Sequence, residues 1–374
     1  MTPDVLFTPL RLGPYTLAHR IVMPPLTRMR AAAPENAPDA LNAEYYSQRA
    51  TPGGLIIAEA TWVDPMGRPY PDVPGIRTAA QVAGWRGITD AVHAKGGIIF
   101  LQLWHAGRIG HSSTKPGGAL PVAPSAVRPA GEIANAAGER VPFETPRALD
   151  LEEIPALIES FRLGARNALA AGFDGIEVHG ANGYLLEQFL QARTNQRTDR
   201  YGGSLENRTR LLHEICAAVA EIVGPDRVGV RLSPYGIASD SHEDDPMTLY
   251  THVVKSLAAL DLAFIHLVEP RASGVGMREI DRSEQPQGAT LFRPLWPNIL
   301  ISTGGHTPDS AVRLLAKGDA DAIGFGRHFI SNPDLPLRVK RGAPLTHYDR
   351  PTFYTKGPKG YTDYPFLDAA AGAS

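Results

Sequence analysis

Cysteine is nearly absent from this sequence, since Cys216 is the only one among 374 residues. A single thiol excludes an internal disulfide framework and a cysteine-ligated iron–sulfur cluster. Long basic runs are missing too, because 37 Lys and Arg face 39 Asp and Glu and leave a formal charge of −2. This balance argues against nucleic acid or an anionic membrane surface as the partner.

Signals for export, for a membrane span and for several common catalytic sites are also lacking. The segment Met1–Leu10 has neither the basic region nor the apolar core of a signal peptide, and no run of about 18 apolar residues follows it. The sequence contains no Walker A loop, no G-x-S-x-G elbow and no H-E-x-x-H zinc motif. We therefore expect a cytoplasmic protein without a metal site.

Short apolar runs recur along the chain, and each ends in polar, Gly or Pro residues. They are Arg20–Thr27, Gly54–Thr61, Ile98–His105, Gly175–Gly180, Val228–Pro234, Phe264–Glu269, Ile299–Thr303 and Ala322–Gly326. Such runs are typical of buried parallel strands, and segments with helix-capping residues lie between them. The pattern predicts a (β/α)₈ barrel that spans residues 1–374 as one domain. A doubly wound sheet is the alternative, but Pro24-Pro25 stands where its glycine-rich loop is expected.

The stretch Ala106–Leu149, after the third predicted strand, has no helical period and is rich in Gly, Pro and Ala. It is too long for an ordinary connection between a strand and a helix. We expect residues 106–149 to form a lid or a small hairpin subdomain over the strand ends.

Glycine pairs end the last two predicted strands, at Gly304-Gly305 and at Gly324–Arg327. In barrels of this kind the loops after the seventh and eighth strands often bind phosphate, since exposed backbone N–H groups and glycine admit the anion. Arg327 would add a charge-assisted contact. Two tight turns and a surface arginine are the alternative explanation.

The segment that ends the fourth predicted strand holds His179, Asn182 and Tyr184. A histidine and an asparagine side by side are able to donate hydrogen bonds to one oxygen and to stabilise negative charge on it. Tyrosine, with an unperturbed pKa of about 10, remains a proton donor at neutral pH. Alternatively, the histidine and asparagine satisfy buried backbone groups.

Arg231 lies inside an apolar run, so its charge requires a structural carboxylate or an electron-rich ligand. The amide of Gln102 matches the donor and acceptor edge of a heterocycle. Trp104, Tyr70 and Tyr354 are candidates for aromatic pocket walls. None of the eight runs contains a lysine, which argues against a Schiff-base barrel aldolase.

At this point the sequence resembles a known family, the old yellow enzymes, which are flavin-dependent ene-reductases, in their classical bacterial type. The resemblance covers nearly the whole chain. The matching segments are Leu6–Pro9, Met23–Arg28, Ala58–Thr61, Leu101–Arg108, His179–Tyr184, Thr194–Gly203, Glu206–Arg208, His266–Arg271, Gly324–Arg327 and Gly360–Pro365. Thr27 stands where the thermophilic-like branch has a cysteine, which places the chain in the classical branch.

The resemblance implies a (β/α)₈ barrel with non-covalent FMN and with NADPH, or NADH, as hydride donor. The implied contacts to the flavin ring are Pro25, Thr27, Ala60, Gln102 and Arg231, and those to its phosphate are Gly305, Gly326 and Arg327. His179 and Asn182 would bind the oxygen of the activating group, and Tyr184 would protonate the α-carbon. Tyr70, Trp104 and Tyr354 would shape the substrate pocket.

The activity implied by this resemblance is reduction of an alkene conjugated to a carbonyl or nitro group. One site used in turn by nicotinamide and alkene implies ping-pong kinetics. Two other functions remain as alternatives at this stage. One is a flavin-free lyase or isomerase that binds a substrate phosphate at the glycine pairs, and the other is a flavin-binding redox sensor or storage protein without turnover.

Overall fold

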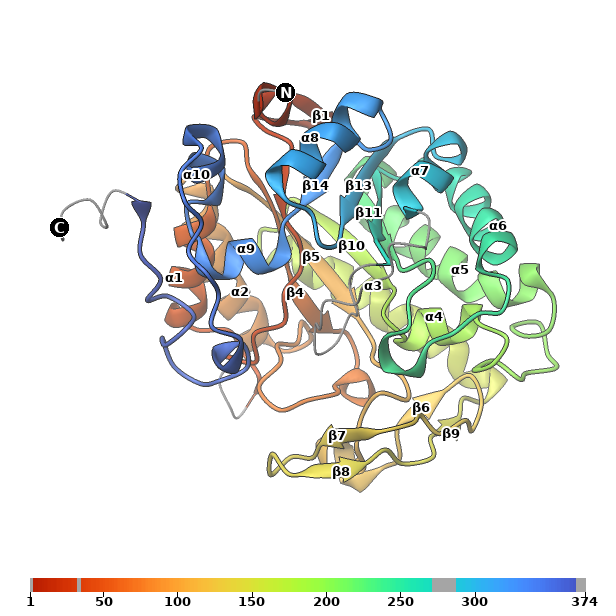
Figure 1. Cartoon of the computed structure of the whole chain (residues 1–374). Helices are drawn as coiled ribbons and strands as arrows, with labels where there is room; N and C mark the ends of the chain where they lie inside the picture. Colours follow the sequence, from red (N-terminus) through yellow and green to blue (C-terminus); the bar gives the residue numbers. More distant parts are fainter. Residues whose placement is uncertain (1–2, 32–34, 271–286, 368–374) are drawn as a thin grey trace.

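The computed structural model describes residues 3–31, 35–270 and 287–367. Within these residues eight parallel strands close into a barrel in the order β10-β11-β12-β13-β14-β3-β4-β5 (Figure 1). The strands are β3 (Ile21–Met23), β4 (Leu55–Trp62), β5 (Ile98–Trp104), β10 (Gly175–Gly180), β11 (Val228–Leu232), β12 (Phe264–Val268), β13 (Ile299–Thr303) and β14 (Ala322–Gly324). The predicted barrel is confirmed, and each strand lies within its predicted apolar run except β4, which extends one residue further, to Trp62.

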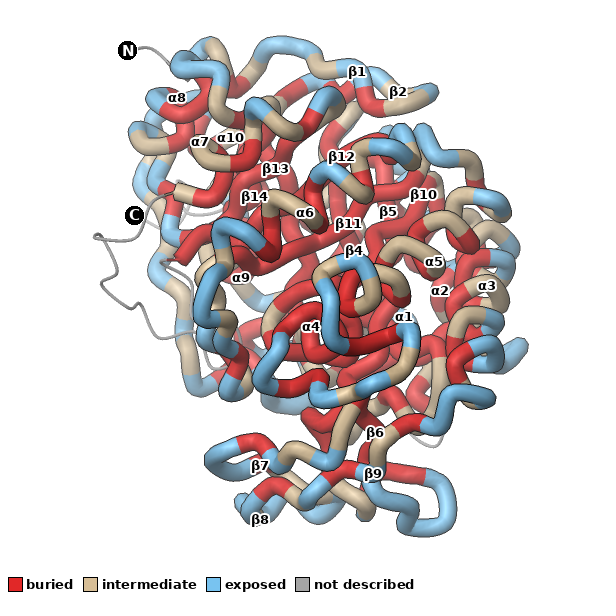
Figure 2. Tube along the Cα trace, turned by 90° about the vertical axis from the view of Figure 1, so that its right-hand side faces the viewer, coloured by how far each residue is buried: buried red, intermediate tan, exposed pale blue. Residues whose placement is uncertain are grey.

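Helices surround the barrel, and Figure 2 shows the buried strands inside a partly exposed helical coat. Pro246 and Pro308 begin α6 and α8 after the capping residues Asp245 and Thr307, since a proline at the first position loses no helical hydrogen bond. No helix in the described ranges is long and apolar enough to cross a membrane. The helices are α1 (Ala40–Arg49), α2 (Ala79–His93), α3 (Ile154–Ala170), α4 (Leu185–Leu190), α5 (Leu205–Val223), α6 (Pro246–Ala258), α7 (Gly288–Phe292), α8 (Pro308–Lys317), α9 (Gly326–Ser331) and α10 (Leu335–Arg341).

The amino-terminal half of the barrel interior is filled by apolar side chains in layers. Phe100 and Phe264 meet there with ring centroids 5.9 Å apart. The neighbouring strands carry Gly175 and Gly229, where a Cβ atom would approach these two rings to 2.4 and 2.1 Å. Large and small residues therefore alternate around the layer, as the narrow interior of an eight-stranded barrel requires.

A hairpin of β1 (Leu10–Leu12) and β2 (Tyr15–Leu17) supplies further apolar side chains to this end of the barrel. Leu12 and Leu17 are buried in one hydrophobic cluster with Phe100 and Phe264. The bottom of the barrel is consequently closed to water, and polar chemistry is left to the opposite end.

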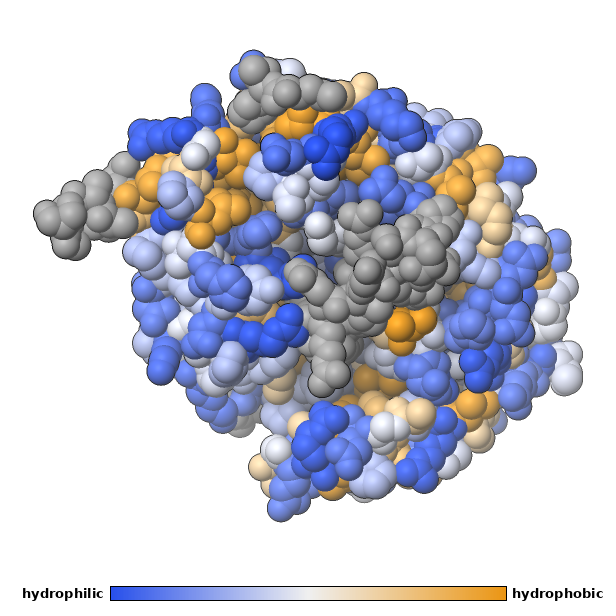
Figure 3. All heavy atoms as spheres, viewed as in Figure 1, coloured by the Kyte–Doolittle hydropathy of each residue, from blue (hydrophilic) through white to orange (hydrophobic). Residues whose placement is uncertain are grey.

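The insertion 106–149 contains β6 (Val122–Ala123), β7 (Glu132–Ala134), β8 (Arg140–Pro142) and β9 (Arg147–Ala148). β7 and β8 form an antiparallel hairpin, and β6 pairs with β9 in parallel. These strands lie beside one rim of the barrel, and their outer surface is mostly hydrophilic (Figures 1 and 3). Whether the insertion acts as a lid stays a prediction.

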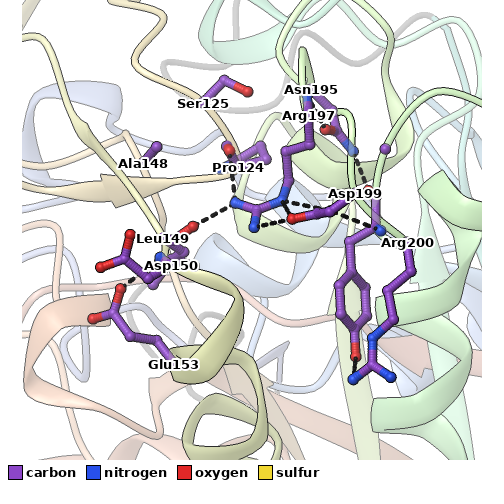
Figure 4. Close-up of polar contacts among 12 residues, drawn as sticks. Pro124, Ser125, Ala148, Leu149, Asp150, Glu153, Asn195, Arg197, Asp199 and Arg200 are labelled. Atoms are coloured by element: carbon purple, nitrogen blue, oxygen red, sulfur yellow. Dashed lines mark hydrogen bonds and ion pairs between the residues drawn. The ribbon is translucent and has the colours of Figure 1, made fainter.

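Arg197, from the loop after α4, binds a middle segment and the carboxyl-terminal end of this insertion (Figure 4). Its Nη1 donates to the backbone oxygens of Pro124 (3.1 Å) and Leu149 (2.5 Å). Asp199 orients the guanidinium, because its carboxylate accepts from Arg197 Nε and Nη2. Side chains of the segment Thr194–Gly203, singled out from the sequence, therefore join the insertion to the barrel.

Candidate active site

A layer of buried polar side chains fills the barrel interior above the apolar layers, on adjacent strands. Glu177 on β10 accepts a hydrogen bond from Nε2 of Gln102 on β5 (2.7 Å). Its second oxygen lies 2.6 Å from Nδ1 of His266, whose Nε2 lies 2.7 Å from the hydroxyl of Thr303. Because the amide nitrogen of Gln102 faces Glu177, its amide oxygen is left for a ligand.

Arg231 on β11 lies beside this layer with 8% of its surface exposed. Its Nε has no hydrogen-bond partner, and no carboxylate of the described residues lies within ion-pair distance of it. Burial lowers the pKa of the guanidinium, and the charge of Glu177 acts against that. A buried cation with an unpaired donor favours the ligand explanation over a structural carboxylate.

Aromatic rings surround His179 at the end of β10. Its ring centroid lies 5.1 Å from that of Tyr184 and 6.4 Å from that of Trp104, and the latter two are 4.9 Å apart. His179 Nδ1 and Trp104 Nε1 are buried without a hydrogen-bond partner. Desolvation, followed by the charge of Arg231, lowers the pKa of His179 well below its usual value, so the imidazole is neutral.

Asn182 and Tyr184 follow His179 in a tight turn that begins α4. Asn182 has a left-handed backbone with φ of 59°. Burial, and then Tyr70, raises the pKa of Tyr184 well above its usual value, so its hydroxyl keeps the proton that a general acid needs. Tyr70 lies near Trp104, whereas Tyr354 is 42% exposed at the carboxyl-terminal rim.

The other residues predicted for the cofactor lie at the same end of the barrel. Pro25 and Thr27 directly follow β3, where the two prolines end the strand. Ala60 lies in an irregularity of β4, because the pairing with β5 shifts register between Ala58 and Thr61. Such a bulge turns a side chain away from the regular alternation.

The expected phosphate-binding residues follow β13 and β14. Gly304 and Gly305 have φ of 144° and 66°, which other residues rarely adopt. Gly326 begins α9, and Arg327 donates to the hydroxyl of Tyr348 (3.2 Å). Both positive φ values show why glycine is required in the turn after β13.

Sequence reasoning missed the partners Glu177 and His266, because each stands in an apolar run whose pairing with its neighbours was unknown. Cys216 is fully buried on α5, and burial raises the pKa of its thiol, so it is a poor nucleophile. Arg271, at the end of one matching segment, lies outside the described residues. No cluster of three metal-binding side chains occurs in the ranges that the structure covers.

A parallel barrel with unpaired buried polar groups at the carboxyl ends of its strands is typical of a barrel enzyme that binds a ligand there. Comparison with known proteins shows the family to which this barrel belongs. Residues 5–346 match the family described as NADH:flavin oxidoreductase / NADH oxidase. The chain belongs to this family, and it is a flavin-dependent oxidoreductase of the old yellow enzyme type.

Individual relatives match over almost their whole length. 12-Oxophytodienoate reductase 2 of Arabidopsis thaliana is 44% identical over 369 residues, which cover 98% of this chain and 96% of the relative. A structure of morphinone reductase with tetrahydroNAD is 45% identical with a TM-score of 0.90 and covers 98% of both chains. The old yellow enzyme homologue from Zymomonas mobilis is 43% identical with a TM-score of 0.91, covering 97% of this chain and 99% of that one.

These relatives confirm the resemblance that the sequence motifs indicated, together with the barrel fold. They also support a flavin and a nicotinamide as the two redox partners. The flavin-free lyase or isomerase alternative is accordingly not favoured.

Proposed function

We propose that this protein reduces the C=C bond of α,β-unsaturated carbonyl or nitro compounds, with FMN as its resident cofactor and NADPH, or NADH, as hydride donor. The observation that carries the proposal is the buried, neutral His179 with its unpaired Nδ1, followed by Asn182 and packed against the protonated Tyr184. A carbonyl-binding pair and a proton donor at one strand end match the needs of conjugate reduction.

The residues present fit FMN. The unpaired Nε of Arg231 and the free amide oxygen of Gln102 suit the pyrimidine edge of the flavin ring, with Pro25, Thr27 and Ala60 nearby on β3 and β4. Gly305, Gly326 and Arg327 suit its phosphate. When bound, FMN would supply two-electron redox chemistry, as the carrier of a hydride from the nicotinamide to the alkene.

The chain's own residues then perform three tasks. His179 and Asn182 donate hydrogen bonds to the oxygen of the activating group, which draws electrons from the alkene and makes its β-carbon electrophilic. Tyr184 gives its proton to the α-carbon. Trp104, Tyr70 and Tyr354 line the site and restrict how the alkene enters.

The test uses the purified protein. We expect a flavin absorbance spectrum and steady NADPH oxidation with 2-cyclohexen-1-one, and we expect the double variant His179→Ala/Asn182→Ala to lose the alkene-dependent rate while retaining FMN. A protein that is colourless and fails to take up FMN contradicts the cofactor. A double variant with wild-type turnover contradicts the carbonyl-binding pair.

The cytoplasmic location stays a prediction. The old yellow enzyme family leans towards NADPH, whereas the morphinone reductase structure carries tetrahydroNAD. Comparing kcat/KM for the two nicotinamides with one alkene tests the preference directly.

A further inference from the structure

The turn that carries Asn182 has an unusual backbone. Asn182 and Gly183 both have positive φ, of 59° and 75°. Asparagine adopts this conformation more often than most other residues with a side chain, and hydrogen bonds from neighbouring groups fix its orientation in the turn. The direction in which the Asn182 side chain leaves the backbone therefore depends on what binds the two backbone N–H groups of the turn.

Both backbone N–H groups are hydrogen-bonded, one directly and one through a hydroxyl group, to the carboxylate of Glu187 on α4. The Gly183 N–H donates directly to Glu187 Oε2 (2.5 Å). The Asn182 N–H donates to the hydroxyl of Ser233 (2.8 Å), which donates in turn to Glu187 Oε1 (2.6 Å). Ser233 follows Arg231 and β11, so the chain of hydrogen bonds joins two strand ends.

Glu187 is fully buried, and further donors complete its surroundings. The hydroxyl of Tyr250 on α6 donates to Oε1 (2.5 Å), and that of Ser241 donates to Oε2 (3.3 Å). Burial raises the pKa of Glu187, whereas the hydrogen bonds from Ser233, Tyr250 and Gly183 act against this. A carboxylate surrounded only by donors is a rigid acceptor, and its amide equivalent offers one acceptor oxygen fewer.

Gln188, the next residue of α4, holds the other side of the same turn. Its Nε2 donates to the backbone oxygens of Gly183 (2.7 Å) and Ala106 (3.1 Å). The first turn of α4 thus contacts the N–H groups and a carbonyl of the 182–183 turn. Sequence reasoning gave Glu187 no role.

We propose that Glu187 is a positioning residue for the substrate-binding pair: its carboxylate, directly and through Ser233, holds the left-handed turn that presents Asn182 to the substrate oxygen. This inference rests on the proposed function, because it assumes that Asn182 binds that oxygen. Glu187 itself touches neither substrate nor cofactor.

The experiment uses the FMN-loaded protein and cyclohexanone, a saturated ketone that presents a carbonyl oxygen and accepts no hydride. Binding is followed as a change in flavin absorbance. We expect Glu187→Gln to raise the Kd of cyclohexanone about tenfold, which corresponds to about 1.4 kcal/mol. FMN content stays that of the wild type, and the backbone N–H of Gly183 exchanges faster with solvent.

A double-mutant cycle separates positioning from general stability. In an Asn182→Ala background, Glu187→Gln should leave the Kd of cyclohexanone unchanged, because the group it positions is gone. Asp334→Asn serves as a control, since Asp334 is another buried carboxylate that accepts a backbone N–H, from Leu367 (2.6 Å), together with Nε of Arg338 (2.6 Å), but lies beside α10. It should lower the Tm and leave cyclohexanone binding intact.

The outcomes distinguish failure of the carbonyl-binding role of Asn182 from failure of the positioning role of Glu187. If Asn182→Ala binds cyclohexanone as the wild type does, the proposed carbonyl-binding role fails. If Asn182→Ala weakens binding and Glu187→Gln does not, or if the two effects simply add, the proposal for Glu187 is overturned. Should Glu187→Gln fail to fold, Ser233→Ala breaks the link to Asn182 alone, and it is expected to raise the Kd about threefold, with an unchanged Kd counting against the proposal.

Discussion

The same eight strands build two different interiors within one barrel. Near their amino ends they contribute Phe100, Phe264 and their apolar neighbours, closed from below by the β1–β2 hairpin. One layer higher, β5, β10 and β12 contribute Gln102, Glu177 and His266, which are just as buried but polar. The boundary falls between residues only two positions apart on a strand, since Phe264 and His266 face the same interior.

This contrast shows how the barrel separates stability from chemistry. The apolar layers remove large side chains from water and stabilise the fold without regard to ligand. The polar layer satisfies most of its hydrogen bonds internally and leaves Arg231 Nε, His179 Nδ1 and Trp104 Nε1 unpaired. A substitution in the apolar layers should therefore change stability, and a substitution in the polar layer should change the binding of cofactor or substrate.

The largest effect is expected for Tyr184→Phe, above the boundary. Loss of the hydroxyl removes the proposed proton donor and should slow C=C reduction by about 10²- to 10⁴-fold. Flavin reduction by NADPH and the Tm should stay nearly unchanged, because the ring and its packing against Trp104 remain. Stopped-flow measurement of the two half-reactions checks this, and equal loss in both would refute the proton-donor role.

Phe264→Ala tests the other side of the boundary. Phe264 is fully buried, and its removal opens a cavity below His266, so the free energy of unfolding should fall by about 3–5 kcal/mol. Urea unfolding measures the loss. Activity per FMN-loaded molecule should stay within a few-fold of wild type, and a variant that keeps its stability but loses turnover would show that the two halves are not separable.

Arg231→Met changes a residue of the polar layer and should have opposite effects on the protein without FMN and the protein with FMN. Without FMN, the unpaired buried cation destabilises the fold, so the substitution should leave the apoprotein equally or more stable. With FMN, a hydrogen bond to a charged group is lost, and affinity should fall by about 1.5–3 kcal/mol. FMN titration and urea unfolding of the apoprotein check both, and equal losses would indicate a structural arginine.

The fold could be predicted from the sequence because each strand carries its own signal. β13 was predicted with the bounds that the structure shows, and β3 is shorter than predicted because Pro24-Pro25 supplies no N–H groups to a ladder. The strand ends in turn pointed to His179 and Asn182, since the rule for parallel barrels places chemistry there.

The buried polar partners could not be predicted in the same way. Glu177 and His266 meet only because the register of β10, β11 and β12 brings them together, and no local pattern encodes that register. Glu187 and Ser233 are also far apart along the chain, and their contact depends on a turn with left-handed residues. Contacts between residues far apart in the sequence are therefore the part of the site that a single sequence does not predict.

The smallest effect is expected for Lys115→Met, a buried charge outside the barrel interior. Lys115 belongs to the insertion, and its Nζ donates to the backbone oxygen of Arg68 (2.5 Å). Desolvation, and then the charge of Arg68, lowers the pKa of Lys115 to about 7. Because Lys115 lies outside the candidate active site, substituting it measures how burial of a charge affects stability without changing the site.

The sign of the pH dependence follows from proton binding. Above pH 7 the folded Lys115 has lost its proton while the unfolded lysine keeps it up to about pH 10.4, so stability rises with pH in that window. Relative to Lys115→Met, the wild-type free energy of unfolding should rise by about 1 kcal/mol per pH unit from pH 7 to 9. Substitution of the exposed Lys95 by Met is the control and should produce no such slope, and a pH-independent difference at Lys115 would show that charge burial alone does not affect stability there.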